Sequence, residues 1–175
     1  MKYFTSDEHI GHKAMLYFPE GRHKFSTTSE MEEYIIDKWN SVVTIRDEVY
    51  VLGDFAYKCS KRYAESIFWQ LNGIKYLIPG NHDNKVALKF IDCWRSIDLI
   101  KRVSITLPNG VEQYLLLSHR PFLSWESKCW HLHGHTHGKI QELNKGIKRL
   151  DVSVELYDYT PISEEQVINL LRDIQ

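Results

Sequence analysis

Short runs of apolar and β-branched residues recur along this chain, and each run ends in a cluster of polar, ionisable side chains. Five such runs are KYFTSDEH at 2–9, EVYVLGD at 48–54, IKYLIPGNHD at 74–83, EQYLLLSH at 112–119 and CWHLHGHTH at 129–137. Apolar runs of this length are typical of buried strands. The chain is therefore expected to contain five strands with polar chemistry at their carboxyl ends.

Between the first three runs, the apolar spacing changes to that of helices. Residues 27–42 carry one helical pattern, with Ser29 as a candidate N-cap, and residues 60–73 carry another. Gly73 is expected just past the end of the second helix, where a left-handed cap is common. This alternation of strand and helix predicts a parallel sheet in the first half of the chain.

The second half has a different character. Residues 103–119 contain two strand-like stretches around a Pro-Asn-Gly sequence, which indicates a hairpin. Residues 140–156 indicate a second hairpin that turns at 144–146. The last pattern is a helix over 163–174 with a capping box at its start. Two mixed sheets packed face to face, with helices outside, would accommodate this order in an α/β fold.

The composition is that of an ordinary globular protein and limits the number of domains and the kinds of partner that we expect. The 175 residues are 43% hydrophobic and 26% charged, with a net charge of −1. No repeat or linker marks a boundary, so we expect one domain over residues 1–175. The balanced charge and the lack of a basic or aromatic track give no indication of nucleic acid, although it stays open as a substrate.

The cysteines and the N-terminal residues bear on the cellular location of the protein. Cys59, Cys93 and Cys129 form no C-x-x-C motif and no even-numbered framework, so reduced thiols are expected. The chain starts without a secretory apolar segment, and no apolar run approaches the ~20 residues that span a bilayer. We therefore expect a cytoplasmic protein with no membrane partner. The oligomeric state stays open.

Side chains that can bind metal follow all five strand-like runs. They are Asp7 and His9, then Asp54, then Asn81, His82 and Asp83, then His119, and finally His135 and His137. Each cluster alone has an ordinary explanation, because acids are common in turns and caps and a histidine can be part of a core. Ligands of open α/β sheets, however, bind at the carboxyl ends of the strands. All five clusters share that placement, which favours one metal site.

The histidine run at 129–137 divides into two pairs. His135 and His137 lie two residues apart at the end of the strand, so they point to the same side. Two charged imidazoles there would repel each other, whereas a divalent cation holds both neutral. His131 and His133 share the same parity but lie further back along the strand. For them, packing or a supporting role is expected.

The order of these clusters resembles that of the calcineurin-like metallophosphoesterases. The matching blocks are Asp7-x-His9, Gly53-Asp54, Gly80-Asn81-His82-Asp83, His119 and Gly134-His135-x-His137. The stretch FTSDEHIGHKAM is similar to small bacterial and phage-type members. The resemblance implies a four-layer αββα sandwich with two metal ions at the sheet edge. By motif position, Asp7, His9, Asp54 and His137 would hold one ion. Asp54, Asn81, His119 and His135 would hold the other.

The implied chemistry is hydrolysis of a phosphate ester. Two ions about 3.5–4 Å apart can clamp a phosphate and lower the pKa of a bridging water to ~7, and that hydroxide would attack phosphorus in line. This mixture of ligands suits manganese, the ion we expect, as well as iron, nickel or zinc. By resemblance, His82 would protonate the leaving group or stabilise the transition state, and Asp83 would orient its imidazole. A helix cap remains the alternative for Asp83.

The class of substrate stays open between phosphomonoesters and phosphodiesters. A nuclease, a cyclic-nucleotide phosphodiesterase or a protein-binding scaffold on the same fold are the alternatives. The sequence GDFAYKC lacks the arginine of the GDxVDRG motif of protein phosphatases, which makes a phosphoprotein substrate less expected. Lys58 and Arg120 are candidate contacts to phosphate, and His12 is either a supporting residue or part of the surface.

Overall fold

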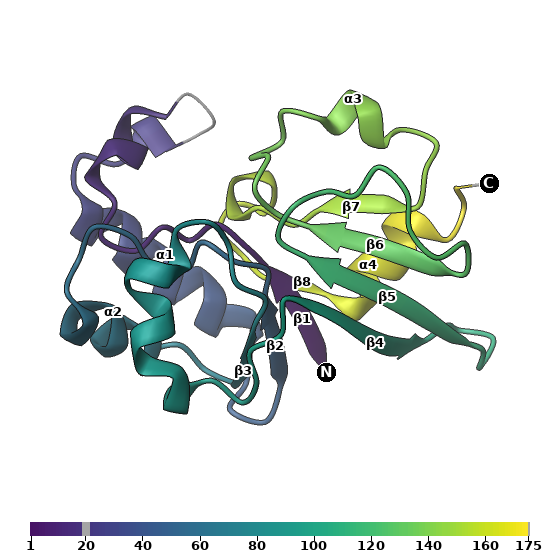
Figure 1. Ribbon diagram of the computed structural model, residues 1–175, viewed down its shortest axis with the longest axis horizontal. Coiled ribbons are helices and arrows are strands. Elements are labelled where there is room, and N and C mark those ends of the chain that lie inside the picture. Colours follow the sequence, from purple (N-terminus) through teal and green to yellow (C-terminus); the bar gives the residue numbers. More distant parts are fainter. Residues whose placement is uncertain (19–21, 175) are drawn as a thin grey trace.

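Two four-stranded mixed sheets form the centre of the molecule (Figure 1). They are seen in a computed structural model, which describes residues 1–18 and 22–174. The strand order is β3-β2-β1-β8 in the first sheet and β4-β5-β6-β7 in the second. The expected α/β sandwich of two mixed sheets is confirmed.

The first sheet contains the predicted parallel strands. These are β1 (Lys2–Thr5), β2 (Glu48–Val51) and β3 (Ile74–Leu77), and the short β8 (Ile162–Ser163) runs antiparallel to β1. Successive side chains enter different cores: Val49 and Val51 face the helices, and Tyr50 faces the second sheet. Burial on both faces explains why these strands read as continuous apolar runs.

Two helices cover the outer face of the first sheet. Helix α1 spans Thr28–Val42 and α2 spans Lys61–Phe68. The side chain of Thr27 accepts a hydrogen bond from the backbone N–H of Glu30, so Thr27 is the N-cap of α1 and the prediction of Ser29 was wrong. The short 3₁₀ helices are η1 (Lys13–Tyr17), η2 (Arg22–Lys24), η3 (Asp83–Lys85), η4 (Ala87–Cys93) and η5 (Val154–Tyr157). Within the described ranges, no helix is long and apolar enough to cross a membrane.

The second sheet confirms one predicted hairpin and corrects the other. Strands β4 (Ile100–Thr106) and β5 (Glu112–Ser118) form the first hairpin. Strands β6 (Cys129–His133) and β7 (Arg149–Asp151) are parallel, and the short helix α3 (Gln141–Asn144) lies on the connection between them. Asn144 is buried and its Oδ1 accepts a 2.6 Å hydrogen bond from Arg149 Nε, so this segment is anchored to the sheet where an exposed turn was expected.

The core between the sheets is closed on one side by the last helix. Helix α4 (Glu164–Leu171) begins at the predicted capping box and contributes Val167 and Leu171 to this core. It contacts β8 and β7, the edge strands of the two sheets. On the face of the second sheet that points away from the first sheet, Phe122 stacks on His131 with ring centroids 5.1 Å apart. The short helix α3 lies beside this sheet as well (Figure 1). The fourth layer is therefore thin.

The carboxyl ends of both sheets meet at one edge. Strands β1, β2 and β3 run in the same direction, and so do β5, β6 and β7. The two ends are tied together by a 2.8 Å hydrogen bond from His119 Nδ1 to the carbonyl of Leu52. Within the second sheet, the N–H of Gly134 donates a 3.0 Å hydrogen bond to the carbonyl of His119. This edge holds the residues that the sequence singled out.

Candidate metal centre

Six of the seven predicted metal ligands form two neighbouring groups at this edge. In each group, every residue offers one ligand atom and these atoms lie within 4.8 Å of one another. The Asp7 group consists of Asp7, His9 and His137, and the Asp54 group consists of Asp54, His119 and His135. The division matches the two sets of ligands that the resemblance implied.

Asp54 lies within reach of both groups. Its Oδ2 is 3.8 Å from His9 Nε2 in the Asp7 group and 3.6 Å from His119 Nε2 in its own. The seventh predicted ligand, Asn81, places its Oδ1 3.2 Å from the same His119 nitrogen. One carboxylate is thus positioned to be shared by two ions, with the amide oxygen beside the second.

Five of these residues have a left-handed backbone. The φ angles are 63° for Asp7, 53° for His9, 56° for Asp54, 71° for His135 and 47° for His137. A non-glycine residue in this region is uncommon, and such strain costs of order 1–3 kcal/mol. Its concentration at the predicted ligands is typical of a functional site.

Two glycines allow the loops to approach one another. A Cβ atom on Gly53, which has a φ of +91°, would lie 2.5 Å from His119 Nδ1. A Cβ atom on Gly134 would lie 2.5 Å from Asp7 Oδ2. Both contacts are too close for a side chain, so glycine at these motif positions is what brings the ligands of different strands together.

Unpaired polar atoms in the Asp7 group fit a cation. Asp7 Oδ2 accepts hydrogen bonds from the N–H of His135 at 2.8 Å and from Ser153 Oγ at 3.1 Å. Among the described residues, Asp7 Oδ1 and His9 Nε2 are buried without a hydrogen-bond partner, and they lie 3.8 Å apart. Leaving such atoms unpaired costs about 1–3 kcal/mol each. An oxygen and an imidazole nitrogen that converge in this way are suited to a divalent transition metal.

Burial sets the protonation of the site. It lowers the pKa of His9 well below the usual value, with help from the charge of Arg22, and it lowers the pKa of His135 to about 4. Burial and then the charge of Asp7 raise the pKa of Asp54 to about 7. His9 and His135 are therefore neutral, as ligands must be. Burial also acts to lower the pKa of His137, but the hydrogen bond to Glu155 and the charges of Asp7 and Glu155 outweigh it, so this pKa is raised. The raised pKa of Asp54 means that its carboxylate would be stabilised by an added positive charge.

A buried chain of charges fixes the orientation of His137. Its Nδ1 donates a 2.9 Å hydrogen bond to Glu155 Oε1, which also accepts one of 2.6 Å from Arg22 Nε. Arg22 donates further hydrogen bonds to the backbone carbonyls of Asp7 and Glu8. A carboxylate at Nδ1 keeps the proton there and leaves Nε2 free, the usual arrangement behind a metal-binding histidine. Neither Arg22 nor Glu155 belongs to a motif that sequence analysis could recognise.

His82 lies beside the two groups, as expected for a residue that acts on substrate. Its Nε2 is 3.8 Å from Asp54 Oδ2, and its ring is 4.2 Å from that of Tyr57, centroid to centroid. The backbone N–H of His82 donates a 2.8 Å hydrogen bond to Asp54 Oδ1. The side chain is about one-third exposed (31%), so its imidazole is accessible to a ligand.

Asp83 holds the backbone of two loops beside the proposed ligands. Its buried carboxylate accepts hydrogen bonds from the backbone N–H groups of Asp54 at 2.7 Å, Phe55 at 2.9 Å and Gly80 at 2.7 Å. Asp83 thus joins the loop after β2 to the loop after β3, and it supports the site through the backbone.

Two further candidates from the sequence lie next to the ligands. His12 Nδ1 is 3.3 Å from His9 Nδ1, and burial lowers the pKa of His12 to about 4. Arg120 is exposed and donates hydrogen bonds to His135 Nε2 at 2.7 Å and to Asn81 Oδ1 at 3.2 Å. Lys58 is a third candidate, and its Nζ lies over the ring of Tyr57, 5.3 Å from the centroid. These residues border the centre.

Comparison with known proteins places the chain among relatives of similar length. No family model matches it. The uncharacterized protein MJ1445 of Methanocaldococcus jannaschii is 31% identical over 176 residues, which cover 97% of this chain and 90% of the relative. The chain belongs to the family of MJ1445.

Two further similar proteins also match this chain over nearly its whole length. The Gene 66 protein of Mycobacterium phage L5 is 28% identical over 199 residues, covering 98% of this chain and 94% of the phage protein. The crystal structure of AQ665, a protein of unknown function from Aquifex aeolicus, matches with a TM-score of 0.70 and 27% identity, covering 97% of this chain and 98% of that one. All three matches extend over nearly the whole chain, and AQ665 shares its fold.

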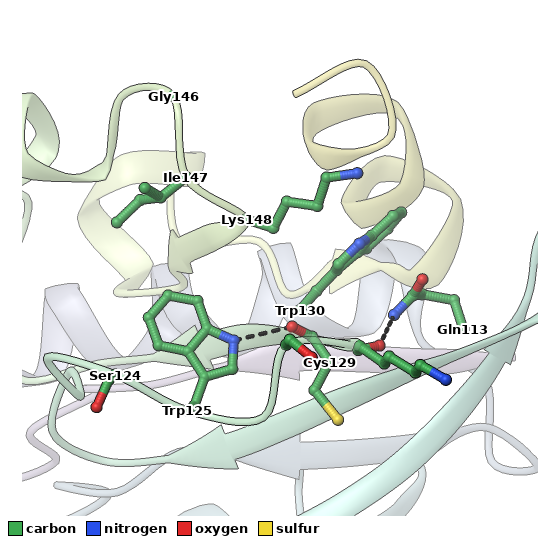
Figure 2. A pocket seen from close by; sticks show the side chains of 10 residues that line it. Gln113, Ser124, Trp125, Cys129, Trp130, Gly146, Ile147 and Lys148 are labelled. Carbon is green, nitrogen blue, oxygen red and sulfur yellow. Dashed lines mark hydrogen bonds between the residues drawn. The ribbon is translucent and has the colours of Figure 1, made fainter. Parts of the chain in front are cut away.

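A cavity of about 520 Å³ lies at the amino end of β6, away from the candidate metal centre (Figure 2). Figure 2 shows Trp125 and Trp130 on either side, with Ile147 and Lys148 above. Two of its polar groups already have partners within the protein: Trp125 Nε1 donates to the carbonyl of Cys129 at 2.8 Å, and Gln113 Nε2 donates to that of Lys128 at 2.9 Å. We therefore assign the site to the opposite edge.

His131 is fully buried behind the site, and the pH dependence of stability tests its protonation state. Its Nε2 lies 2.8 Å from Ser118 Oγ, and burial lowers its pKa to about 3. His131 is thus protonated at a lower pH in the folded protein than in the unfolded chain. The neutral His131 contributes to the free energy of unfolding above pH ~6.5, and this contribution is lost as the pH falls below that value. We expect His131→Gln to reduce the loss of unfolding free energy between pH 7 and pH 5 by roughly 2 kcal/mol.

Urea unfolding at both pH values measures this effect. His23→Gln, at an exposed histidine, is the matched control and should behave like the wild type. An equal acid sensitivity of His131→Gln and wild type would contradict the buried, neutral state of His131.

Proposed function

We propose that this protein is a metal-dependent phosphoesterase that hydrolyses phosphomonoesters or phosphodiesters with two divalent transition-metal ions. The observation that carries the proposal is the convergence of the six side chains of the two groups and Asn81, with Asp54 Oδ2 within 3.8 Å of histidines from both groups. Seven ligands exceed what a single tetrahedral ion uses, whereas one shared carboxylate gives each of two ions four.

The ligand sets follow from the two groups. Asp7, His9, Asp54 and His137 would hold one ion, and Asp54, Asn81, His119 and His135 would hold the other. When bound, the two cations would supply Lewis acidity, lowering the pKa of water and neutralising charge on a phosphoryl group. Nitrogen and oxygen ligands of this kind suit manganese, iron, nickel or zinc, and manganese is our first choice.

The chain itself supplies the remaining functions. His82, with Nε2 3.8 Å from Asp54 Oδ2, is placed to hold the proton that a leaving oxygen requires. Arg120 offers planar N–H donors at the exposed side of the Asp54 group, where they match the oxygens of a phosphoryl group. His119 donates its Nδ1 proton to the carbonyl of Leu52, so its Nε2 lone pair faces the site.

A protein-binding scaffold on the same fold fits the observations less well. A scaffold gains nothing from buried atoms without partners, such as Asp7 Oδ1 and His9 Nε2, or from five strained residues at one edge. We also propose a cytoplasmic location, in keeping with the free thiols of Cys59, Cys93 and Cys129.

Metal analysis combined with hydrolysis tests the proposal. The purified protein, loaded with manganese or nickel, is expected to bind up to two ions per chain. It should hydrolyse p-nitrophenyl phosphate or bis-p-nitrophenyl phosphate, with activity lost on chelation and restored by the same ion. Protein that binds no ion after loading and hydrolyses neither ester would overturn the proposed function.

A further inference from the structure

A cavity of about 380 Å³ opens directly beside the Asp54 group. It lies between the loop that follows β3 and the end of β5. Its lining comprises Pro79, Gly80, Asn81, Leu99, Ile100, Ser118, His119, Arg120 and Phe122. Two of these residues, Asn81 and His119, are proposed metal ligands, so a molecule bound at the ions would extend into this space.

The outer wall of the cavity is apolar. Leu99 is 81% exposed and Ile100 is 53% exposed, and both reach solvent at the start of β4, the edge strand of the second sheet. The sheet register pairs Ile100 with Ser118, the residue before His119. Single exposed apolar residues are ordinary on a protein surface. These two, however, line a hollow that ends at the metal centre, where an apolar wall selects the organic part of a ligand.

Arg120 joins the apolar wall to the ligands. It lines the cavity, and its guanidinium reaches His135 Nε2 at 2.7 Å and Asn81 Oδ1 at 3.2 Å. Both acceptors are proposed ligand atoms, so cation binding would leave the guanidinium donors available to an anion. The cavity therefore combines a site for anionic oxygens with an apolar surface next to it, which fits an organic phosphate.

The proposed proton donor, His82, is not among the residues that line this cavity. Its ring neighbours those of Tyr57 at 4.2 Å and His9 at 5.4 Å, and its Nε2 lies 3.8 Å from the shared Asp54 Oδ2. The cavity borders the Asp54 group, with His119 in its lining. His82 must reach the leaving group in order to protonate it. An organic group bound in the cavity is therefore not the leaving group but a second substituent on phosphorus. A monoester has one such substituent, and a diester has two.

We propose that this cavity binds the non-leaving ester group of a phosphodiester, and that this group is apolar or aromatic. The inference rests on the proposed function and makes the substrate a diester. In the reaction, the oxygen of one water bonds to phosphorus and the P–O bond to the leaving group breaks. The leaving oxygen takes a proton from His82. The proton that the attacking water loses then returns to His82. The product monoester keeps its organic group in the cavity.

Binding of phosphinates, which contain no ester bond, tests the cavity independently of hydrolysis. In the zinc-loaded protein, diphenylphosphinate should bind about tenfold more tightly than dimethylphosphinate, because the cavity buries an aryl ring. Methyl NMR should show shifts at Leu99 and Ile100 with the diphenyl compound. Leu99→Ser and Ile100→Ser should each reduce the preference. Ile45→Ser, at a residue that is 76% exposed before β2, should keep it. Equal binding of the two phosphinates by the wild type would overturn the inference.

Kinetics of the manganese-loaded protein supply the second arm. The ratio of kcat/KM for bis-p-nitrophenyl phosphate to that for p-nitrophenyl phosphate should fall about tenfold in the Leu99→Ser, Ile100→Ser double variant. An unchanged ratio would refute the cavity assignment and leave the phosphoesterase proposal standing. An aryl preference in binding, together with no hydrolysis of either ester, would refute the phosphoesterase proposal and leave the cavity as a binding site for aryl anions.

Discussion

Replacing Asp54 by asparagine is expected to lower phosphate-ester turnover by roughly 10³-fold or more while the protein stays folded. Asp54 Oδ2 is the atom that lies near both groups, 3.8 Å from His9 Nε2 and 3.6 Å from His119 Nε2. Asparagine has the same shape, and its Oδ1 can still accept the hydrogen bond from the N–H of His82. It lacks the charge that a shared ligand must supply to two cations.

The same substitution should leave stability unchanged or raise it in the absence of metal. Burial and Asp7 raise the pKa of Asp54 to about 7, so the ionised carboxylate is unfavourable in the empty folded protein above that pH. Metal content, kcat/KM and the unfolding midpoint at pH 8 are the measurements, and Asp37→Asn on the exposed face of α1 is the control. Wild-type turnover and metal content in Asp54→Asn would show that this carboxylate is not a ligand.

Truncation of Asp83 to alanine is expected to lower the free energy of unfolding by about 3–5 kcal/mol, since buried N–H groups cost about 1–3 kcal/mol each when left unpaired. Three backbone N–H groups, those of Asp54, Phe55 and Gly80, share this one carboxylate. Water would have to enter the junction between two loops to replace it. Because the Asp54 loop is one of the two, metal affinity should fall as well.

Urea unfolding of the metal-free protein measures the loss. Asp83→Asn should be intermediate, because one amide oxygen remains to accept hydrogen bonds and the NH₂ group cannot. Asp37→Ala on α1 should unfold like the wild type. If Asp83→Ala kept wild-type stability but changed the pH dependence of kcat, the original expectation that Asp83 acts on the imidazole of His82 would be favoured over the backbone role seen here.

The parts of the fold that could be predicted are those set by local pattern. Strands β1, β2 and β3 are buried on both faces, so their apolar runs are continuous, and the helices between them require a parallel arrangement. The hairpin of β4 and β5 follows from its Pro-Asn-Gly turn. The connection before β7 was mistaken for a hairpin because Asn-Lys-Gly is a turn sequence. Nothing local shows that Asn144 is buried against Arg149.

The ligand positions could be predicted for a related reason. Each lies directly after an apolar run, and the geometry of parallel strands brings such positions to one edge. The residues that hold the ligands in place gave no such signal. Glu155 meets Arg22 across 133 positions of the chain, and Ser153 meets Asp7 across 146. These contacts depend on how the two sheets are placed relative to each other, which the pattern along one strand does not determine.

The left-handed backbone of the ligands has a consequence for anyone who improves this protein in the laboratory. Glycine adopts that conformation without strain, so a glycine at the partly buried His135 would relieve about 1 kcal/mol of backbone energy. At Asp7 or Asp54, by contrast, it would leave the N–H groups of His135 or His82 without their acceptor. A library selected for heat resistance alone would therefore accumulate glycine at His135 and gain stability while it lost a proposed metal ligand. Directed evolution on this scaffold needs a metal-dependent selection in every round.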